Sequence, residues 1–508
     1  MTHRGLAVDL GAGSGRVLLG TLTDGRLNLE EVHRFGNEPV WVHGRLCWDI
    51  LGLYREILQG LRQGVARGGP LPTTMGIDTW GVDFGFIDAR GHLLQNPVCY
   101  RDSRTDGLAD ESLRRCGGEG FLFGLTGLPD LFFNTSLQLM AVNSQEPALV
   151  GLVDRLLFTP DLLNYFLTGV ARAERTIAGT SQLLSAGARG GWSSTVFLSL
   201  GLDAWFQKMP ELIEPGTVLG PLTLEVADKA GLPRLQVVAV AGHDTESSLL
   251  AMPALSEGAV FLNVGSWAIL GLETDEPILD DRFRLAGFSN EAGFGGVVCL
   301  LKNIMGLWLA QESKLTWERE GGPLEWADLY RQAAEAPGFQ AFVDPDDALF
   351  VAPGEMPQRI KEYCSRTGQT PPETRGQVLR CILESLAFCF REALEALATL
   401  SGKNLSRVHL MGGGCRGELL CQFTADACGR VVEAGPDEAS GTGNLLAQFL
   451  ATGTLTSVDE ARAVVRDSFQ TRIYEPRATE LWAQAYAQFQ RATKATMSMR
   501  APNPELAV

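Results

Sequence analysis

The sequence lacks the features that mark membrane-spanning and nucleic-acid-binding proteins. Its longest apolar stretches, such as residues 260–272, are interrupted by Gly, Ser or Asn and fall short of the roughly 18 apolar residues of a membrane span. Acidic residues (60) outnumber basic ones (43), and the net charge of −17 would repel a phosphate backbone because no local basic patch offsets it. We therefore expect neither a membrane nor a nucleic acid as a partner.

Sequence motifs for zinc, for disulfide frameworks and for Walker-type nucleotide binding are also missing. The 10 cysteines include no CxxC pair, and the 6 histidines form no HExxH motif. No GxxxxGK[ST] motif occurs. The N-terminal residues reach Asp9 before a signal-peptide core could form. We therefore expect reduced cysteines, no zinc centre and a cytoplasmic protein.

What the sequence does contain is an α/β pattern in each half. Its 508 residues, 45 % of them hydrophobic, predict two or more domains with buried cores. In the first half, apolar or alternating runs predict strands at 6–10, 16–22, 27–34 and 75–79 and a helix at 50–67. A comparable order returns later, with strands at 237–241, 259–264, 268–273, 296–301, 407–411 and 430–434 and helices at 303–313, 375–400 and 417–428. The two halves therefore look like one plan used twice, and we interpret residues 318–358 as loops.

A glycine-rich turn follows the first predicted strand. The run Asp9-Leu10-Gly11-Ala12-Gly13-Ser14-Gly15-Arg16 opens a second strand rather than a helix, which argues against a dinucleotide-binding fold. Its backbone amides and the Ser14 hydroxyl could approach phosphate, and Asp9 at the strand end could hold Mg2+. From the residues alone, a tight hairpin whose glycines serve only turn geometry remains an equal alternative.

A second motif, Gly242-His243-Asp244-Thr245-Glu246, directly follows the predicted strand at 237–241. A carboxylate at the C-terminal end of a parallel strand lies where ligands bind in open α/β sheets. Asp244 or Thr245 could instead cap the helix that follows and have no chemical role. The residues alone leave both interpretations open.

Two further glycine motifs lie in the second half of the chain. Asn263-Val264-Gly265-Ser266-Trp267 mirrors the first hairpin, and Met411-Gly412-Gly413-Gly414-Cys415 runs from a strand through glycines into a helix. Such glycines let a ribose or a flat ring approach the backbone, or they serve only close packing of the turn. One glycine hairpin in each half, the two facing each other across a cleft, is the organisation of the actin-like ATPase fold.

The chain resembles the FGGY family of carbohydrate kinases in five motifs that occur in the family's order between about residues 7 and 471. They are Gly76-Ile77-Asp78-Thr79-Trp80-Gly81-Val82-Asp83-Phe84, Tyr100-Arg101-Asp102-Ser103-Arg104-Thr105, the motif at 242–245, Lys302-Asn303-Ile304-Met305-Gly306-Leu307-Trp308-Leu309, and Gly412-Gly413-Gly414-Cys415. The resemblance implies an α/β protein of two actin-like (ribonuclease H-like) domains with an interdomain cleft. We expect an N-terminal domain over 1–245, a nucleotide-binding C-terminal domain over 246–475, and a C-terminal helix and tail over 476–508.

The resemblance also implies an activity: transfer of the γ-phosphoryl group of MgATP to the C1 hydroxyl of the ketose L-rhamnulose, in L-rhamnose catabolism, by a monomer or small homo-oligomer. Asp244 matches the family's catalytic base and, with Asp9, would be a partner of Mg2+. The residues expected at ATP are Ala12, Gly13, Ser14, Gly15, Arg16, Ser266, Gln311, Gly413 and Gly414. Those expected at the sugar are Gly81, His243, Thr245 and Asn303. Such a set suits phosphoryl transfer, which needs positioning and charge neutralisation more than covalent catalysis.

Several residues depart from the family pattern or have a simpler explanation. The family usually has Ser-Gly-Thr where this chain has Val264-Gly265-Ser266, and it has Asn where this chain has Gly417 and Cys421. These differences fall on the nucleotide side. A tryptophan beside a strand end, such as Trp80, more often packs against other side chains than stacks on a sugar. Asp83 could contact or support the sugar, or form a surface ion pair.

Two alternatives to this activity stay open. Another FGGY kinase, for L-fuculose, L-ribulose or D-xylulose, would use the same ATP machinery and differ in a few cleft contacts. A non-catalytic actin-like nucleotide switch or sugar sensor would keep the glycine hairpins but would not need Asp244.

Overall fold

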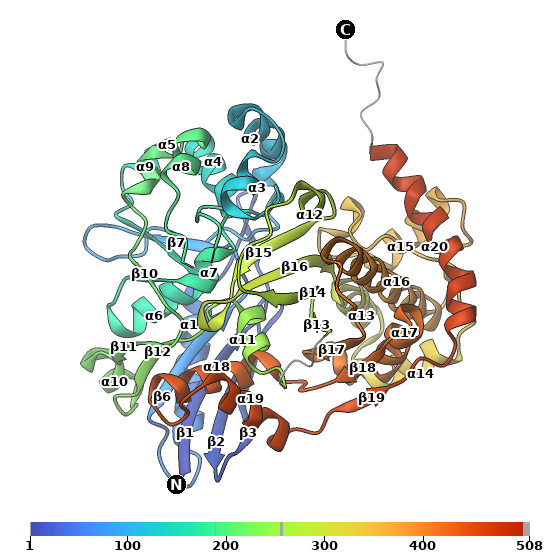
Figure 1. Ribbon diagram of the computed structural model, residues 1–508. Coiled ribbons are helices and arrows are strands. Elements are labelled where there is room, and N and C mark those ends of the chain that lie inside the picture. Colours follow the sequence, from blue (N-terminus) through green and yellow to red (C-terminus); the bar gives the residue numbers. More distant parts are fainter. Residues whose placement is uncertain (1, 188, 254–257, 501–508) are drawn as a thin grey trace. The chain divides into compact units, whose positions relative to one another are not determined.

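The computed structural model describes residues 2–187, 189–253 and 258–500, which form two compact units (Figure 1). The first unit comprises Met1–Leu255, Leu272–Leu301 and Glu438–Gln470. The second comprises Ser256–Gly271, Lys302–Asp437 and Thr471–Val508. Segments distant in sequence thus share a unit, and the domain boundaries expected at 245 and 475 stay a prediction. The expected tail at 501–508 lies outside the described residues.

The first unit is built on a six-stranded sheet with the order β11-β12-β6-β1-β2-β3. Its strands are β1 (Thr2–Leu10), β2 (Ser14–Thr23), β3 (Arg26–Gly36), β6 (Thr74–Thr79), β11 (Thr217–Pro221) and β12 (Gln236–Ala239). β1 pairs antiparallel with β2 and parallel with β6, and β6 pairs parallel with β12. Residues 4–10 of β1 are all buried, which explains the apolar residues between Arg4 and Asp9. The strands predicted in this part of the chain are confirmed.

Helices cover both faces of this sheet. On one face, Gly60 of α1 (Ile50–Val65) lies so close to Val17 that a Cβ at residue 60 would stand 2.3 Å from its Cγ2. On the other face, Gly441 of α18 (Ala439–Ala451) meets the neighbouring side chain, Leu18, in the same way. Val17 and Leu18 point to opposite faces because side chains alternate along a strand. The sheet is therefore buried from both sides.

The first unit contains further helices and short strands, and its residues 84–209 build a helical region with its own core around Phe86 and Trp205. The helices are α2 (Leu108–Cys116), α3 (Phe121–Thr126), α4 (Thr135–Gln145), α5 (Pro147–Val150), α6 (Thr159–Thr168), α7 (Arg175–Gly179), α8 (Ser194–Leu200), α9 (Asp203–Phe206), α10 (Leu224–Ala230), α11 (Asp244–Leu250), α12 (Asp281–Leu285) and α19 (Val458–Ser468). The short strands are β4 (Val40–Val42), β5 (Arg45–Cys47), β7 (Phe84–Ile87), β8 (Arg155–Phe158), β9 (Ala173–Glu174), β10 (Leu212–Ile213) and β15 (Phe288–Ala292).

The second unit repeats the strand pairing of the first. Its strands are β13 (Ala259–Val264), β14 (Trp267–Thr274), β16 (Val298–Met305), β17 (Arg407–Met411), β18 (Val431–Ala434) and β19 (Arg472–Tyr474), and β14 and β16 run on into the first unit. β13 pairs antiparallel with β14 and parallel with β17, as β1 does with β2 and β6. β17 pairs parallel with β18, which pairs antiparallel with β19. The prediction that one α/β plan is used twice is confirmed.

The helices of the second unit confirm most of the sequence predictions and correct two. They are α13 (Trp308–Gly321), α14 (Trp326–Glu335), α15 (Met356–Arg366), α16 (Arg375–Ser401), α17 (Glu418–Cys428) and α20 (Thr479–Arg500). The predicted helix at 303–313 is wrong at its start, because β16 continues to Met305 and the helix begins at Trp308. The interpretation of 318–358 as loops is also wrong, since α13 extends to Gly321 and α14 occupies Trp326–Glu335. Among the described residues, no helix is both long and apolar enough to cross a membrane.

Candidate active site

The glycine-rich turn of the first unit is a hairpin between β1 and β2, as predicted. Asn37 holds it from one side: its Nδ2 donates to the Gly11 carbonyl at 2.8 Å, and its backbone N donates to the Gly13 carbonyl at 3.2 Å. Gly13 and Ser14 are exposed, and a Cβ at Gly13 would meet no atom within 4 Å. The tip of the turn is therefore fixed yet open to a ligand, with the partly buried Ala12 beside it.

Two residues of this turn have structural roles that the sequence did not reveal. Gly15 is buried, and a Cβ there would stand 2.4 Å from the ring of Phe35. Arg16 forms an ion pair with Asp9, its Nη2 lying 2.7 Å from Asp9 Oδ2, and a second ion pair with Glu438 at the start of α18. Burial alone would lower the pKa of Arg16, but the two carboxylates outweigh it and raise the pKa. The expected contact of Arg16 with phosphate stays a prediction.

A third carboxylate, Asp78, lies next to Asp9 across the parallel pair of β1 and β6. Asp78 is fully buried; its Oδ2 accepts a hydrogen bond from Asn444 Nδ2 at 2.6 Å, and its Oδ1 has no hydrogen-bond partner among the described residues. Burial raises the pKa of Asp78 well above its usual value, and the charges of Asp9 and Asp244 raise it further. An orphaned carboxylate oxygen beside two other carboxylates fits a hard divalent cation such as Mg2+.

Asp244 is the first residue of α11, and its side chain is 28 % exposed. The N-cap position belongs to His243, so the structure does not support the alternative that Asp244 is only a helix cap. Thr245 Oγ1 lies 3.3 Å from Asp244 Oδ1 and donates to it. Burial raises the pKa of Asp244 to about 6. The negative charge of Asp9 also raises this pKa, whereas the charge of His243 lowers it. Such a carboxylate is mostly ionised at neutral pH and able to accept a proton.

The loop that carries Asp244 is anchored by Glu174, a residue that the sequence did not single out. Glu174 Oε2 accepts a hydrogen bond from the Gly242 backbone N at 2.8 Å, and Thr176 Oγ1 accepts one from the His243 backbone N at 3.2 Å. Burial raises the pKa of Glu174 to about 7, although several backbone N–H groups oppose the shift. The start of α7 thereby fixes the backbone immediately before Asp244.

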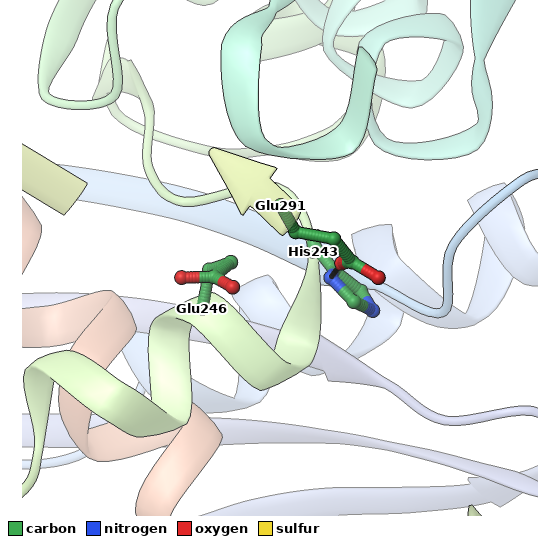
Figure 2. Close-up of side chains that lie close together, drawn as sticks. All are labelled: His243, Glu246 and Glu291. Carbon is green, nitrogen blue, oxygen red and sulfur yellow. Dashed lines mark ion pairs between the residues drawn. The ribbon is translucent and has the colours of Figure 1, made fainter. Parts of the chain in front are cut away.

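His243 lies in a buried cluster with Glu246 of α11 and Glu291 of β15 (Figure 2). Its Nδ1 is 3.1 Å from Glu291 Oε2, and its Nε2 is 3.7 Å from Asp244 Oδ1. Burial lowers the pKa of His243, but the carboxylates, Glu291 first, outweigh it and raise the pKa to about 9. Burial raises the pKa of Glu246 to about 8. One ligand atom from each of the three residues falls within 4.8 Å of the others, so the set could also hold a metal ion.

On the sugar side, Gly81 follows β6 and is partly buried, and Thr180 packs against it. The neighbouring Asp83 is fully buried rather than a surface ion pair. Its Oδ2 accepts hydrogen bonds from Trp48 Nε1 at 2.6 Å and Trp80 Nε1 at 2.9 Å, and the two rings lie 4.3 Å apart. Trp80 is only 5 % exposed and is a packing residue, as expected. Asp83 therefore fixes the aromatic side chains beside Gly81.

In the second unit, two predicted nucleotide residues contact each other. Ser266, in the turn between β13 and β14, donates from its Oγ to Gln311 Oε1 at 2.7 Å. Gln311 lies in the first turn of α13, and the Ser266 carbonyl accepts a hydrogen bond from the Gly306 backbone N at 2.9 Å. Asn303, expected at the sugar, belongs to β16 of this unit and is partly buried.

The three glycines after β17 serve different purposes. A Cβ at Gly412 would stand 2.6 Å from Asn263 Oδ1, and one at Gly414 would stand 2.5 Å from Val264 Cβ, so both positions require close packing. Gly413 is exposed, and a Cβ there would meet nothing within 4 Å, which leaves it open to a ligand. Close packing therefore accounts for Gly412 and Gly414, and the nucleotide contacts expected of Gly413 and Gly414 stay predictions.

Two of the positions at which the chain departs from the family pattern, Gly417 and Cys421, lie near the triple glycine. A Cβ at Gly417 would stand 2.7 Å from the Tyr330 hydroxyl of α14, so this phenol occupies the space of a larger side chain. Cys421 is buried in α17, and burial raises its pKa to about 12.

Comparisons with known proteins agree across the whole chain. The N-terminal domain model of the FGGY family of carbohydrate kinases matches residues 6–251, and its C-terminal domain model matches residues 260–452. A rhamnulokinase of Bacteroides thetaiotaomicron is 40 % identical over 97 % of this chain and 100 % of its own length. A rhamnulokinase of Bacillus subtilis is 36 % identical over 93 % of this chain and 95 % of its own length.

Solved structures with low sequence identity have the same fold. A xylulose kinase from Lactobacillus acidophilus matches with a TM-score of 0.76 at 15 % identity, over 98 % of both chains. A glycerol kinase from Plasmodium falciparum, solved with ADP, matches with a TM-score of 0.74 at 15 % identity, over 99 % of both chains.

Proposed function

Because the chain belongs to the FGGY family of carbohydrate kinases and is a sugar kinase, we propose that it transfers the γ-phosphoryl group of ATP to the C1 hydroxyl of L-rhamnulose. The products would be L-rhamnulose 1-phosphate and ADP. The choice of sugar is supported by relatives of 36 to 40 % identity that are rhamnulokinases over nearly their full length. The choice of reaction rests on one observation, the partly exposed carboxylate of Asp244 at the first residue of α11.

Asp244 is the proposed general base. Its carboxylate would accept the proton of the C1 hydroxyl as that oxygen attacks the γ-phosphorus and the bond to the ADP oxygen breaks. Thr245 donates to Oδ1 of Asp244 and so restrains the direction in which the carboxylate points. Removing Asp244 would leave the substrates bound without a proton acceptor.

The phosphates of ATP would be bound by the open hairpin tip in the first unit and by Ser266 in the second. Gly13 and Ser14 offer exposed backbone and hydroxyl groups, and Gln311 already holds the Ser266 hydroxyl. A Cβ at Gly413 would meet no described atom within 4 Å, and this glycine would lie against the nucleoside.

Asp9 and Asp244 would hold Mg2+, and Asp78 has the orphaned oxygen that such an ion would satisfy. When bound, Mg2+ neutralises charge on the phosphates. Arg16, already paired with Asp9, offsets part of the negative charge at this place.

The sugar would be bound by Gly81, His243 and Thr245 of the first unit and by Asn303 of the second. Buried donors and acceptors discriminate strongly between hydroxyl epimers, because a wrong epimer leaves a polar group unpaired. L-Fuculose, an epimer of L-rhamnulose, should therefore be a much poorer substrate. Loss of an apolar contact with the 6-methyl group should cost only about 1 to 3 kcal/mol in kcat/KM.

The test is ADP release on a panel of L-rhamnulose, L-fuculose, L-ribulose and D-xylulose, with Asp244→Asn as the matched control for contaminating kinases. We expect the highest kcat/KM with L-rhamnulose and almost no activity in the control. Efficient turnover of another ketose, together with no turnover of L-rhamnulose, would refute the substrate assignment. No ketose-dependent ADP release at all would favour a nucleotide switch or sugar sensor.

A further inference from the structure

The ion pair between His243 and Glu291 joins parts of the first unit that are distant in sequence (Figure 2). Glu291 lies on β15, and its side chain is 5 % exposed, whereas His243 precedes α11. Neither the short motif around His243 nor the sequence around Glu291 indicates that these side chains meet.

The geometry distinguishes the two ring nitrogens. Nδ1 lies 3.1 Å from Glu291 Oε2, which is an ion-pair distance, although the two atoms lack the alignment of a hydrogen bond. Nε2 lies on the side of Asp244, 3.7 Å from Oδ1. The ring atom next to the proposed base is therefore Nε2.

We propose that Glu291 is a positioning residue that fixes the ring of His243, so that Nε2 is presented to the sugar beside Asp244. This inference rests on the proposed function, in which His243 contacts the ketose. Glu291 itself would touch neither substrate. It would act through His243 alone. In other proteins, too, a group that contacts one ring nitrogen of a histidine orients the other nitrogen for its function.

The backbone around Glu291 is anchored well enough for this role. The preceding residue, Asn290, donates from its backbone N to the Gly127 carbonyl at 2.9 Å, and its Oδ1 accepts a hydrogen bond from the Ile278 backbone N at 2.7 Å. Gly179 of α7 packs against the following residue, Ala292, such that a Cβ would stand 3.2 Å from its N. A carboxylate on a backbone held from both sides can impose an orientation on its partner.

Glu246 provides a matched control inside the same cluster. It is as deeply buried as Glu291, but its Oε2 accepts a hydrogen bond from Cys299 Sγ at 3.0 Å. An amide at residue 246 keeps an acceptor for this thiol. Glu246→Gln therefore changes a buried carboxylate of the cluster without removing the contact that orients His243.

The experiment is a double-mutant cycle on the purified full-length protein, comparing Glu291→Gln, Glu246→Gln, His243→Ala and the double variant His243→Ala/Glu291→Gln. Kinetics are measured with ATP and the ketose that the wild type prefers. We expect Glu291→Gln to raise the KM for the ketose about tenfold or more. The neutral amide loses the charge of the ion pair with His243, whereas the thiol partner of Glu246 needs only an acceptor, and a small misplacement of a contact group is costly. The KM for ATP should change less than about twofold, and Glu246→Gln should resemble the wild type. In the His243→Ala background, Glu291→Gln should have no further effect, because coupled residues are not additive.

Three results would overturn the proposal. The first is that His243→Ala and Glu291→Gln change the KM for the ketose independently, and the second is that Glu291→Gln raises the KM values for ketose and ATP equally. The third is that Glu291→Gln and Glu246→Gln lose activity equally and both lose a bound metal. The last would indicate a metal centre. Thermal unfolding identifies a variant that fails to fold, and Glu291→Asp, which keeps the charge, then takes its place. The panel of ketoses tests the proposed function separately, since the cycle uses whichever ketose the wild type prefers.

Discussion

The buried Asp83 permits a quantitative test of how the aromatic side chains beside Gly81 are held. Burial raises the pKa of Asp83 to about 6, although hydrogen bonds from Trp48 and Trp80 oppose the shift. The unfolded chain should titrate near 3.9, so the folded state binds more protons between these two values. The stabilisation is then fully present below the unfolded pKa and is lost as the pH rises through the folded pKa.

Asp83→Asn removes this titration. The free energy of unfolding of the wild type minus that of the variant should therefore fall by roughly 1 to 2 kcal/mol between about pH 5 and about pH 7.5. Urea unfolding at a series of pH values measures both free energies of unfolding. The contributions of other titrating groups cancel when the value for the variant is subtracted from that for the wild type. Asp88→Asn is the control: hydrogen bonds from the His92 backbone lower the pKa of Asp88, so it titrates below this window. A flat or rising difference for Asp83→Asn would refute the reasoning.

Three further predictions address the nucleotide and the chemistry. Asp244→Asn should fold and still bind ATP in calorimetry, yet lose turnover by roughly 10² to 10⁴, as expected for a positioned base; near-normal turnover would contradict the mechanism. Gly414→Ala should lower the free energy of unfolding by about 1 to 3 kcal/mol, because its Cβ would stand 2.5 Å from Val264 Cβ, whereas Gly413→Ala should not; equal urea midpoints would contradict this. Ser266→Ala should raise the KM for ATP and leave that for the ketose unchanged in steady-state kinetics, and the reverse pattern would remove Ser266 from the phosphate site.

Elements with local signals were predictable from sequence. Helix α16 matches its predicted range because Thr374 and Gln377 form a capping box at its start and Gly402 ends it with a φ of +67°. The start of α13 was not predictable. It depends on the Gly306 backbone N, which donates to the Ser266 carbonyl some 40 residues away and ends β16. No local periodicity reports such a contact.

In the candidate site, too, residues with a local sequence signal were predictable and their distant partners were not. Motif residues such as Asp244 and Ser266 were found because each stands at the end of a strand with a distinctive neighbourhood. Their partners were not found: Glu438 pairs with Arg16, and Glu291 pairs with His243, across hundreds or tens of residues. These contacts exist only once the sheet has brought the segments together, so a single sequence carries no pattern for them.

The proposed reaction places one phosphate on a specific hydroxyl of a specific ketose. The most direct measurement is nuclear magnetic resonance of the product formed from L-rhamnulose and ATP, with phosphorus–proton correlation to locate the new ester. We predict one phosphate on C1 for each ADP released, and none with Asp244→Asn. A phosphate on another carbon, or ADP released without a phosphorylated sugar, would contradict the account.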